Sequence, residues 1–155
     1  MILQQNKFMA NKQIEAWKTN IAKDKHVFVA SNVRSIHPVV DQMVRNLLEI
    51  DLIQYVRVSK EDIQASNEIM VRGRTKIPIS THGHPTAVGI HVILDSYNRA
   101  VHFYEITSAV KGYGERMVQA VLNSIPDDWK AAVPMDISGG FWDKMAEKYD
   151  KIVIL

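Results

Sequence analysis

The alternation of apolar and polar positions is clearest in the second half of the chain. Two runs rich in β-branched and aromatic residues flank the turn Ser96-Tyr97-Asn98, which predicts a β-hairpin. After the hairpin, apolar residues recur at helical spacing from Met117 to Ile125. The second half is therefore predicted to alternate between strands and helices: strands over 86–94 and 99–106, a helix over 112–124, a strand over 129–135, a helix over 141–149 and a strand over 151–155.

The first half has a weaker pattern. Pro38 suits the first turn of a helix, because its missing N–H needs no partner there. Ser59, followed by Asp62 three residues later, resembles the start of a capped helix that would reach Asn67. The elements predicted here are a helix over 3–22 with Phe8 as one apolar contact, a strand over 26–30, a helix from Pro38, a helix over 59–67, a strand over 68–74 and a loop over 75–85.

The composition is that of one globular domain spanning residues 1–155. Hydrophobic residues make up 46% and charged residues 23% of the 155 residues. The chain contains no cysteine, which excludes disulfides, a thiolate nucleophile and any zinc site built on cysteine. The net charge of +2 is too small to argue for nucleic acid or a membrane surface. With no apolar stretch of membrane length and no signal-peptide pattern, a cytoplasmic protein is expected.

The segment from Val110 to Glu115 carries the most specific signal. It places Gly112 and Gly114 between a predicted strand and a predicted helix, with Lys111 at the mouth of the turn. Glycines let the backbone approach a ligand closely, and first-turn N–H groups lack intrahelical partners, so this layout suits a pyrophosphate. The spacing differs from that of a P-loop and lacks the third glycine of a dinucleotide fingerprint. A strand-to-helix turn without a ligand is the alternative.

This segment resembles the acetyl-CoA-binding motif Q/R-x-x-G-x-G/A of the GNAT superfamily of N-acetyltransferases. The motif falls on the six residues from Ala109 to Gly114, and Ala109 replaces the leading Gln or Arg. The resemblance implies an α/β fold with a mixed, mostly antiparallel central sheet flanked by helices, in a single acyl-CoA N-acyltransferase-like domain. It also implies that acetyl-CoA (coenzyme A) contacts Ile106, Thr107, Ser108, Val110, Lys111, Gly112, Tyr113, Gly114, Glu115 and Trp142.

The order of predicted elements follows the family along nearly the whole chain, with one departure at the end. The family usually closes its sheet with one strand more than the pattern predicts after residue 150. That strand is absent, or the N-terminal segment supplies it, or a partner subunit does. A homodimer is therefore left open.

Glu105 is the first candidate for a general base, because family members often carry a base carboxylate on this strand, where the sheet opens toward the thioester. The alternative is a surface carboxylate paired with a basic neighbour. His102 is a second candidate on account of its ordinary pKa near 6.5. Strand alternation predicts that His102 and Tyr104 face the side opposite to Glu105.

The proton donor is harder to assign. Many family members carry a tyrosine in the last helix, and that position matches Trp142 in the run Phe141-Trp142-Asp143-Lys144-Met145. An indole N–H cannot deliver a proton in this role. Ser138 and Tyr149 are the substitutes, and the coenzyme A thiolate can also leave without an acid.

Two further clusters have a weaker chemical interpretation. His82 and His84, with His91, form a poor ligand set for a metal, and no metal is expected. Arg72, Arg74 and Lys76 make one loop basic. They are either solvated charges or contacts to an acidic acceptor or to the cofactor phosphates.

The leading hypothesis is an enzyme, an N-acetyltransferase that moves an acetyl group from acetyl-CoA to an amine by direct attack. The acceptor is an amine-bearing protein or small molecule; no membrane or nucleic-acid partner is expected. The alternative is a non-catalytic GNAT-like module that binds coenzyme A or a protein partner. The sequence names no acceptor.

Overall fold

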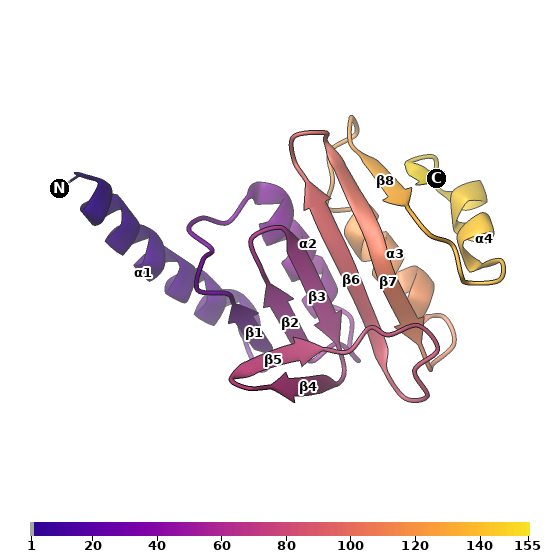
Figure 1. The fold of residues 1–155 in the computed structure, drawn as a ribbon, viewed down its shortest axis with the longest axis horizontal. Coiled ribbons are helices and arrows are strands. Elements are labelled where there is room, and N and C mark those ends of the chain that lie inside the picture. The colour runs from indigo at the N-terminus through magenta and orange to yellow at the C-terminus, as the bar shows by residue number, and fades with distance from the viewer. Residues whose placement is uncertain (1) are drawn as a thin grey trace.

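The computed structural model describes the backbone of residues 2–155 and the side chains of residues 12–155. In that part the chain folds into helices and strands in the order shown in Figure 1. The helices are α1 (Ile2–Ala22), α2 (Pro38–Leu48), α3 (Tyr113–Leu122) and α4 (Phe141–Lys148). The strands are β1 (His26–Val29), β2 (Tyr55–Val58), β3 (Asp62–Ser66), β4 (Ile69–Arg72), β5 (Thr75–Pro78), β6 (Val88–Asp95), β7 (Ala100–Ser108), β8 (Lys130–Val133) and β9 (Ile152–Ile154).

Seven strands form one mixed sheet in the order β1-β2-β3-β6-β7-β8-β9. The three central pairings are antiparallel and contain most of the paired residues, and the outer pairings, β1 with β2, β7 with β8 and β8 with β9, are parallel. β4 and β5 form a separate antiparallel hairpin. A mixed, mostly antiparallel sheet flanked by helices is thus confirmed. None of the described helices is both long and apolar enough to cross a bilayer.

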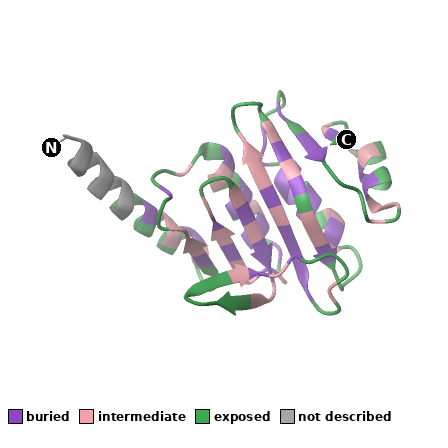
Figure 2. Ribbon diagram, viewed as in Figure 1, coloured by how far each residue is buried: buried purple, intermediate pink, exposed green. Residues whose placement is uncertain are grey.

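Helices α2 and α3 pack against each other behind the sheet in the view of Figure 1. Both present a buried apolar face, from Val39 to Leu48 in α2 and from Gly114 to Leu122 in α3. Ile63, Val92 and Phe103 meet them from the strands, because alternate strand residues point to one face. The core therefore lies between the sheet and these two helices, as the buried residues in Figure 2 show.

The opposite face of the sheet carries the β4–β5 hairpin, which crosses in front of β2 and β3 near their lower ends in Figure 1. The chain that leaves the hairpin comes so close that a Cβ atom on Gly89 would lie 2.1 Å from the carbonyl oxygen of Ile79. A side chain at this position is therefore excluded by the approach of two backbones. Most of the hairpin is exposed (Figure 2).

The sheet opens between β7 and β8. Only Ala100, Val101 and His102 pair with β8, whereas β7 continues to Ser108 and stays paired with β6 throughout. Before the opening β7 contains a bulge, because His91 pairs with Glu105 while the next residue, Val92, pairs with Phe103. The extra residue is Tyr104. One backbone edge of β7 beyond His102 therefore has no strand beside it.

Most predicted elements of the second half are confirmed to within a few residues, but two expectations for the first half are wrong and one strand was not anticipated. Residues 62–66 form strand β3 rather than a helix, because Ile63 and Ala65 alternate into the core between β2 and β6. Part of the predicted loop, Thr75–Pro78, is strand β5. Strand β2 was not predicted, since only four residues carry its alternation. The helix predicted over 3–22 is present, and the contact predicted for Phe8 lies outside the described side chains.

The N-terminal segment does not complete the sheet beside β9. Strand β1 lies at the opposite edge, six strands away from β9, and α1 is helical. Within the described residues, the outer edge of β9 has no neighbouring strand. Of the three ways of completing the sheet, supply by the N-terminal segment is therefore wrong.

Candidate functional site

A cleft occupies the opening between β7 and the segment that links β8 to α4. Its volume is about 340 Å³ and its lining is mostly apolar. Strand β7, the segment after β8, the start of α4 and the loop after β5 all contribute to it. The lining residues are His82, Phe103, Tyr104, Glu105, Ile106, Pro134, Met135, Ile137, Ser138 and Trp142. Four residues expected to be functional, Glu105, Ile106, Ser138 and Trp142, thus come together here.

Glu105 and His102 lie on the same face of the sheet, which corrects the prediction from strand alternation. On β6, His91 and Ile93 are two residues apart and so share a face, and they pair with Glu105 and His102 respectively. The bulge at Tyr104 inserts one residue between them and cancels the alternation. The Tyr104 ring contacts the His91 ring edge-on, with 4.9 Å between the centroids. Tyr104 thereby joins Glu105 in lining the cleft.

Ser138 is held at the cleft wall by a turn and by the start of α4. Its N–H and hydroxyl donate to Oδ1 of Asp136 at 2.9 and 2.6 Å, and its hydroxyl oxygen accepts the N–H of Trp142 at 3.2 Å. These bonds from Ser138 lower the pKa of Asp136. The hydroxyl proton of Ser138 is thus directed at a carboxylate, which fixes the orientation of the side chain.

Trp142 packs in the interior at the base of the cleft. It is 4% exposed, and its ring lies 4.7 Å from that of Phe103 and 5.0 Å from that of Phe141. Phe141 also reaches α3, where a Cβ atom on Gly114 would lie 3.1 Å from its ring. Gly114 is therefore required for the approach of α3 and α4, and Trp142 has the packing role that an indole can fill.

The turn from β7 into α3 has the backbone shape that the glycine pattern predicts. Gly112 caps the helix with φ at +91°, in the left-handed region, and open space surrounds the position of a Cβ atom. Ser108 tightens the turn by donating its hydroxyl to the carbonyl of Val110. Val110 and Lys111 are exposed. Among the described backbone bonds, the N–H groups of Gly114 and Glu115 have no acceptor, as expected for a first helical turn.

Two side chains of this turn bind protein groups. Tyr113 donates its hydroxyl to Asp51 at 2.8 Å, and Arg116 Nη1 lies 3.1 Å from the same carboxylate. These bonds lower the pKa of Asp51, and the bond to Asp51 raises that of Tyr113. These bonds connect the turn to the loop before β2. Because the Tyr113 hydroxyl is bonded to Asp51, only the backbone of Tyr113 is left to contact a ligand at the turn.

Tyr149 does not line the cleft. Its hydroxyl donates to Oε2 of Glu115 at 2.6 Å and accepts from Gln119 Nε2 at 2.8 Å, while Lys148 Nζ lies 3.1 Å from Glu115. The bond from Tyr149 lowers the pKa of Glu115, and the same bond raises the pKa of Tyr149. Glu115 and Tyr149 thus join α3 to the end of α4.

Thr107, next to the cleft residue Ile106, anchors the loop that follows the hairpin. Its buried hydroxyl accepts the N–H of His84 at 3.2 Å, and Nδ1 of His84 accepts the N–H groups of Thr86 and Ala87. This loop carries His82 into the cleft. His82, His84 and His91, which were considered as metal ligands, therefore have different surroundings. Within the described residues, no group of three His, Asp or Glu side chains could hold a metal ion.

Sequence reasoning missed a hydrogen-bonded histidine–aspartate pair beside the cleft. Nε2 of His91 lies 2.7 Å from Oδ2 of Asp62, and both side chains are partly buried. The bond to His91 is the main cause of a lowered pKa for Asp62. The sequence pattern predicts a helix at Asp62, so it gives no sign that Asp62 lies on a strand beside β6, within reach of His91. The apolar alternation of Ile63 and Ala65 was the signal available.

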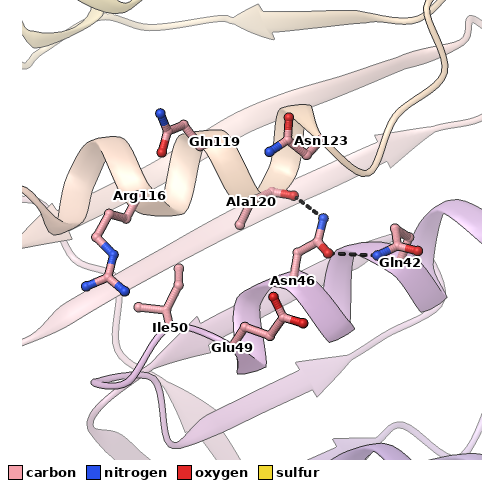
Figure 3. A pocket seen from close by; sticks show the side chains of 8 residues that line it. All are labelled: Gln42, Asn46, Glu49, Ile50, Arg116, Gln119, Ala120 and Asn123. Atoms are coloured by element: carbon pink, nitrogen blue, oxygen red, sulfur yellow. Dashed lines mark hydrogen bonds between the residues drawn. The ribbon is translucent and has the colours of Figure 1, made fainter.

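A second hollow lies between α2 and α3, away from the cleft. Figure 3 shows its polar lining, in which Gln42 donates to Asn46 and Asn46 donates to the carbonyl of Ala120. Its volume is about 500 Å³. Amide groups dominate, and the charges of Glu49 and Arg116 lie at one end (Figure 3). This groove therefore offers mainly amide hydrogen bonds to a ligand.

Comparison of the chain with protein-family models, with curated proteins and with solved structures gave no match.

Proposed function

We propose that the protein is an N-acetyltransferase of the GNAT type, which transfers an acetyl group from acetyl-CoA to an amine in the cleft between β7 and β8. One observation carries the proposal. The sheet opens beside Glu105, and the same strand runs on into the glycine turn and the free first-turn N–H groups of α3. A carboxylate, an apolar cleft and an anion-binding turn are thus arranged along one continuous segment.

The turn suits the diphosphate of coenzyme A. The N–H groups of Gly114 and Glu115 lack acceptors among the described backbone groups, and the positive end of the α3 dipole favours an anion. The space beside Gly112 is open, so a phosphate oxygen can approach the backbone. Lys111 is exposed at the same turn and adds a positive charge.

The cleft suits the thioester arm. The backbone edge of β7 beyond His102 has no strand beside it, and Ile106 and Trp142 contribute apolar surface. Acetyl-CoA supplies an activated acyl carbon, to which the amine nitrogen bonds as the carbon–sulfur bond breaks. No residue has to act as nucleophile, which agrees with a chain that contains no cysteine.

Glu105 is proposed to accept the proton of the amine. It faces the cleft at the bulge, and the mostly apolar lining around it strengthens any charge interaction there. His91 lies directly across on β6, and an imidazole with one nitrogen bonded to Asp62 can accept a proton at the other. Glu105 is in the cleft lining and His91 is behind it, so the first contact with the amine falls to Glu105.

Tyr104 is proposed as the proton donor for the departing thiolate. Tyr104 is the one tyrosine among the residues that line the cleft. The bulge turns Tyr104 to the side of Glu105, whereas the hydroxyl of Tyr149 is bonded to Glu115 on another surface. Ser138, which directs its proton to Asp136, orients the wall of the cleft. We therefore assign the role of acid to Tyr104.

The second candidate function is that of a non-catalytic module that binds coenzyme A or a protein partner. The buried position of Trp142, where many family members carry the acid, favours it. The two hypotheses make the same prediction for cofactor binding and opposite predictions for turnover.

Turnover is tested by mass spectrometry of a panel of amines, including lysine peptides, polyamines and amino sugars, after incubation with acetyl-CoA. We expect transfer to at least one class of acceptor. Glu105→Gln should lower turnover by roughly 10²-fold with unchanged cofactor affinity, the usual range for a lost base. Glu61→Gln, an exposed carboxylate in the β2–β3 turn, is the control and should be neutral. Equal turnover in Glu105→Gln and wild type would remove Glu105 from the mechanism.

A further inference from the structure

A third pocket, the basic pocket, lies at the far edge of the sheet, next to β1 and the tip of the β4–β5 hairpin. Its volume is about 770 Å³. Three cations surround it: Arg57 from β2, and Arg74 and Lys76 from the hairpin. Lys76 Nζ lies 5.5 Å from the centre of the Phe28 ring at the floor of the same pocket. A single hollow thus gathers three positive charges around one aromatic ring.

The cations are available to a ligand. Within the described side chains, neither Arg74 nor Lys76 forms an ion pair with a carboxylate, and both are exposed. Arg57 donates to the Ser59 hydroxyl, and its charge contributes to the lowered pKa of Asp62. No carboxylate lines the pocket. Arg74 and Lys76 therefore offer positive charge to an anionic group, whereas Arg57 also interacts with Asp62.

The pocket and the cleft lie on the same face of the sheet. Phe28 pairs with Arg57, Arg57 with Gln64, Gln64 with His91 and His91 with Glu105, and directly paired residues share a face. Four strand spacings of about 4.8 Å separate the ends of this row, roughly 19 Å in all. In Figure 1, this face is the one turned to the viewer, and the β4–β5 hairpin lies across it at the lower ends of β2 and β3.

From this geometry we infer that the acceptor is an acidic peptide segment, with its amine in the cleft and carboxylates about six residues away in the basic pocket. This inference rests on the proposed function. A small amine at Glu105 cannot also reach Arg74, whereas six extended residues span roughly 20 Å. The charges at the two ends are complementary to such a peptide: Glu105 in the cleft attracts a lysine, and Arg74 and Lys76 attract carboxylates.

The same charges argue against a nucleic acid. A phosphodiester chain along the row would meet the carboxylates of Asp62 and Glu105, and the repulsion of like charges disfavours it. The cations are confined to one end instead of forming a stripe. A peptide of mixed charge fits both ends of the row.

Binding is tested without acetyl-CoA, by fluorescence anisotropy of a labelled ten-residue peptide with one lysine and three glutamates starting six residues after it. A matched peptide carries glutamines in place of the glutamates. We expect the glutamate peptide to bind wild type roughly tenfold more tightly, and the double variant Arg74→Ala/Lys76→Ala to lose that preference. The variant Arg72→Ala is the control, because Arg72 is exposed on the same hairpin but lies outside the pocket.

Equal binding of both peptides to wild type would overturn the inference, as would an equal loss in Arg72→Ala and the double variant. Tighter binding of a labelled ten-nucleotide single strand than of the glutamate peptide would assign the pocket to nucleic acid instead. Because acetyl-CoA is absent from this assay, its failure leaves cofactor binding and turnover to be judged separately. Normal preference for the glutamate peptide without acetyl transfer would retain the pocket and reject the enzyme.

Discussion

The two sides of strand β7 differ in a way that separates scaffold from site. On the β6 side, eight residue pairs form an antiparallel ladder interrupted by one bulge. On the β8 side, three parallel pairs form before the strands part. The first side is paired along the whole strand, whereas the second leaves the backbone of β7 without a neighbouring strand and borders a cleft of about 340 Å³.

The position of the candidate site depends on where the pairing of β7 with β8 stops. Glu105 pairs with β6 and Tyr104 is the extra residue of the bulge, yet both line the cleft. They do so because the bulge lies where β8 separates from β7. A bulge that re-aims a side chain is a common device next to active sites. On the open side, substitutions where α4 packs against the sheet should therefore lower the stability of the protein. Substitutions on the unpaired part of β7 should instead lower its activity.

The largest effect on stability is expected at Trp142, which fixes α4 to the floor of the open side. Trp142→Ala should lower the free energy of unfolding by about 3–5 kcal/mol, because a buried aromatic ring against Phe103 is lost. Trp142→Phe should retain most of the packing and nearly normal turnover. Chemical denaturation and the acetyl-transfer assay measure the two quantities. A strong loss of turnover in Trp142→Phe with normal cofactor affinity would contradict a packing role.

On the closed side, Gly89 should be sensitive for a different reason. Gly89→Ala places a Cβ atom 2.1 Å from the Ile79 carbonyl oxygen, and the resulting shift of backbone should cost about 1–3 kcal/mol. Gly73→Ala is the comparison, since φ there is +64° and no atom lies within 4 Å, so its cost of about 1 kcal/mol is conformational only. Thermal unfolding of both variants measures the difference. A Gly89→Ala protein as stable as wild type would show that the hairpin does not approach β6 so closely.

The smallest expected effect concerns acid stability and the pair of His91 with Asp62. The bond to His91 lowers the pKa of Asp62 in the folded protein below the ordinary value of about 3.9. The pair therefore contributes stability above pH 4, and this contribution is lost as the pH falls below 4 through the folded pKa. Its size should be below roughly 1 kcal/mol, because both side chains retain contact with solvent.

The test is the difference in unfolding free energy between pH 6 and pH 3 for wild type and for Asp62→Asn. The variant should lose less stability on acidification than wild type does. Asp150→Asn, an exposed carboxylate beyond α4, serves as the control. An identical loss in wild type and Asp62→Asn would show that the pair does not couple protonation to folding.

The sequence predicted the second half of the fold because its signals are local. The hairpin of β6 and β7, the glycine turn and the apolar face of α3 each lie within about twenty residues, so periodicity and turn residues suffice. Residues 59–67 were misassigned because Ser59 and Asp62 imitate a helix cap, whereas their strand is set by pairing with β6, some thirty residues away.

The candidate site was predictable only in part. Gly112, Glu105 and Ser138 could be proposed from pattern and resemblance, and Glu105 and Ser138 do line the cleft. Tyr104 could not, because a bulge reverses the facing of a strand without a mark in its sequence. The basic pocket also escaped a full assignment, since Arg57 joins Arg74 and Lys76 only once β2 is placed beneath the hairpin.

Calorimetric titration with acetyl-CoA tests the central claim most directly, since it asks whether the open side of β7 and the turn at Gly112 bind the cofactor. The account predicts binding by wild type and none by Gly112→Asp, in which a carboxylate would meet the diphosphate. Gly73→Asp, also at a left-handed glycine with open surroundings but on the hairpin, should bind as wild type does. No heat and no thermal shift with wild type at millimolar acetyl-CoA, or unchanged binding by Gly112→Asp, would contradict it.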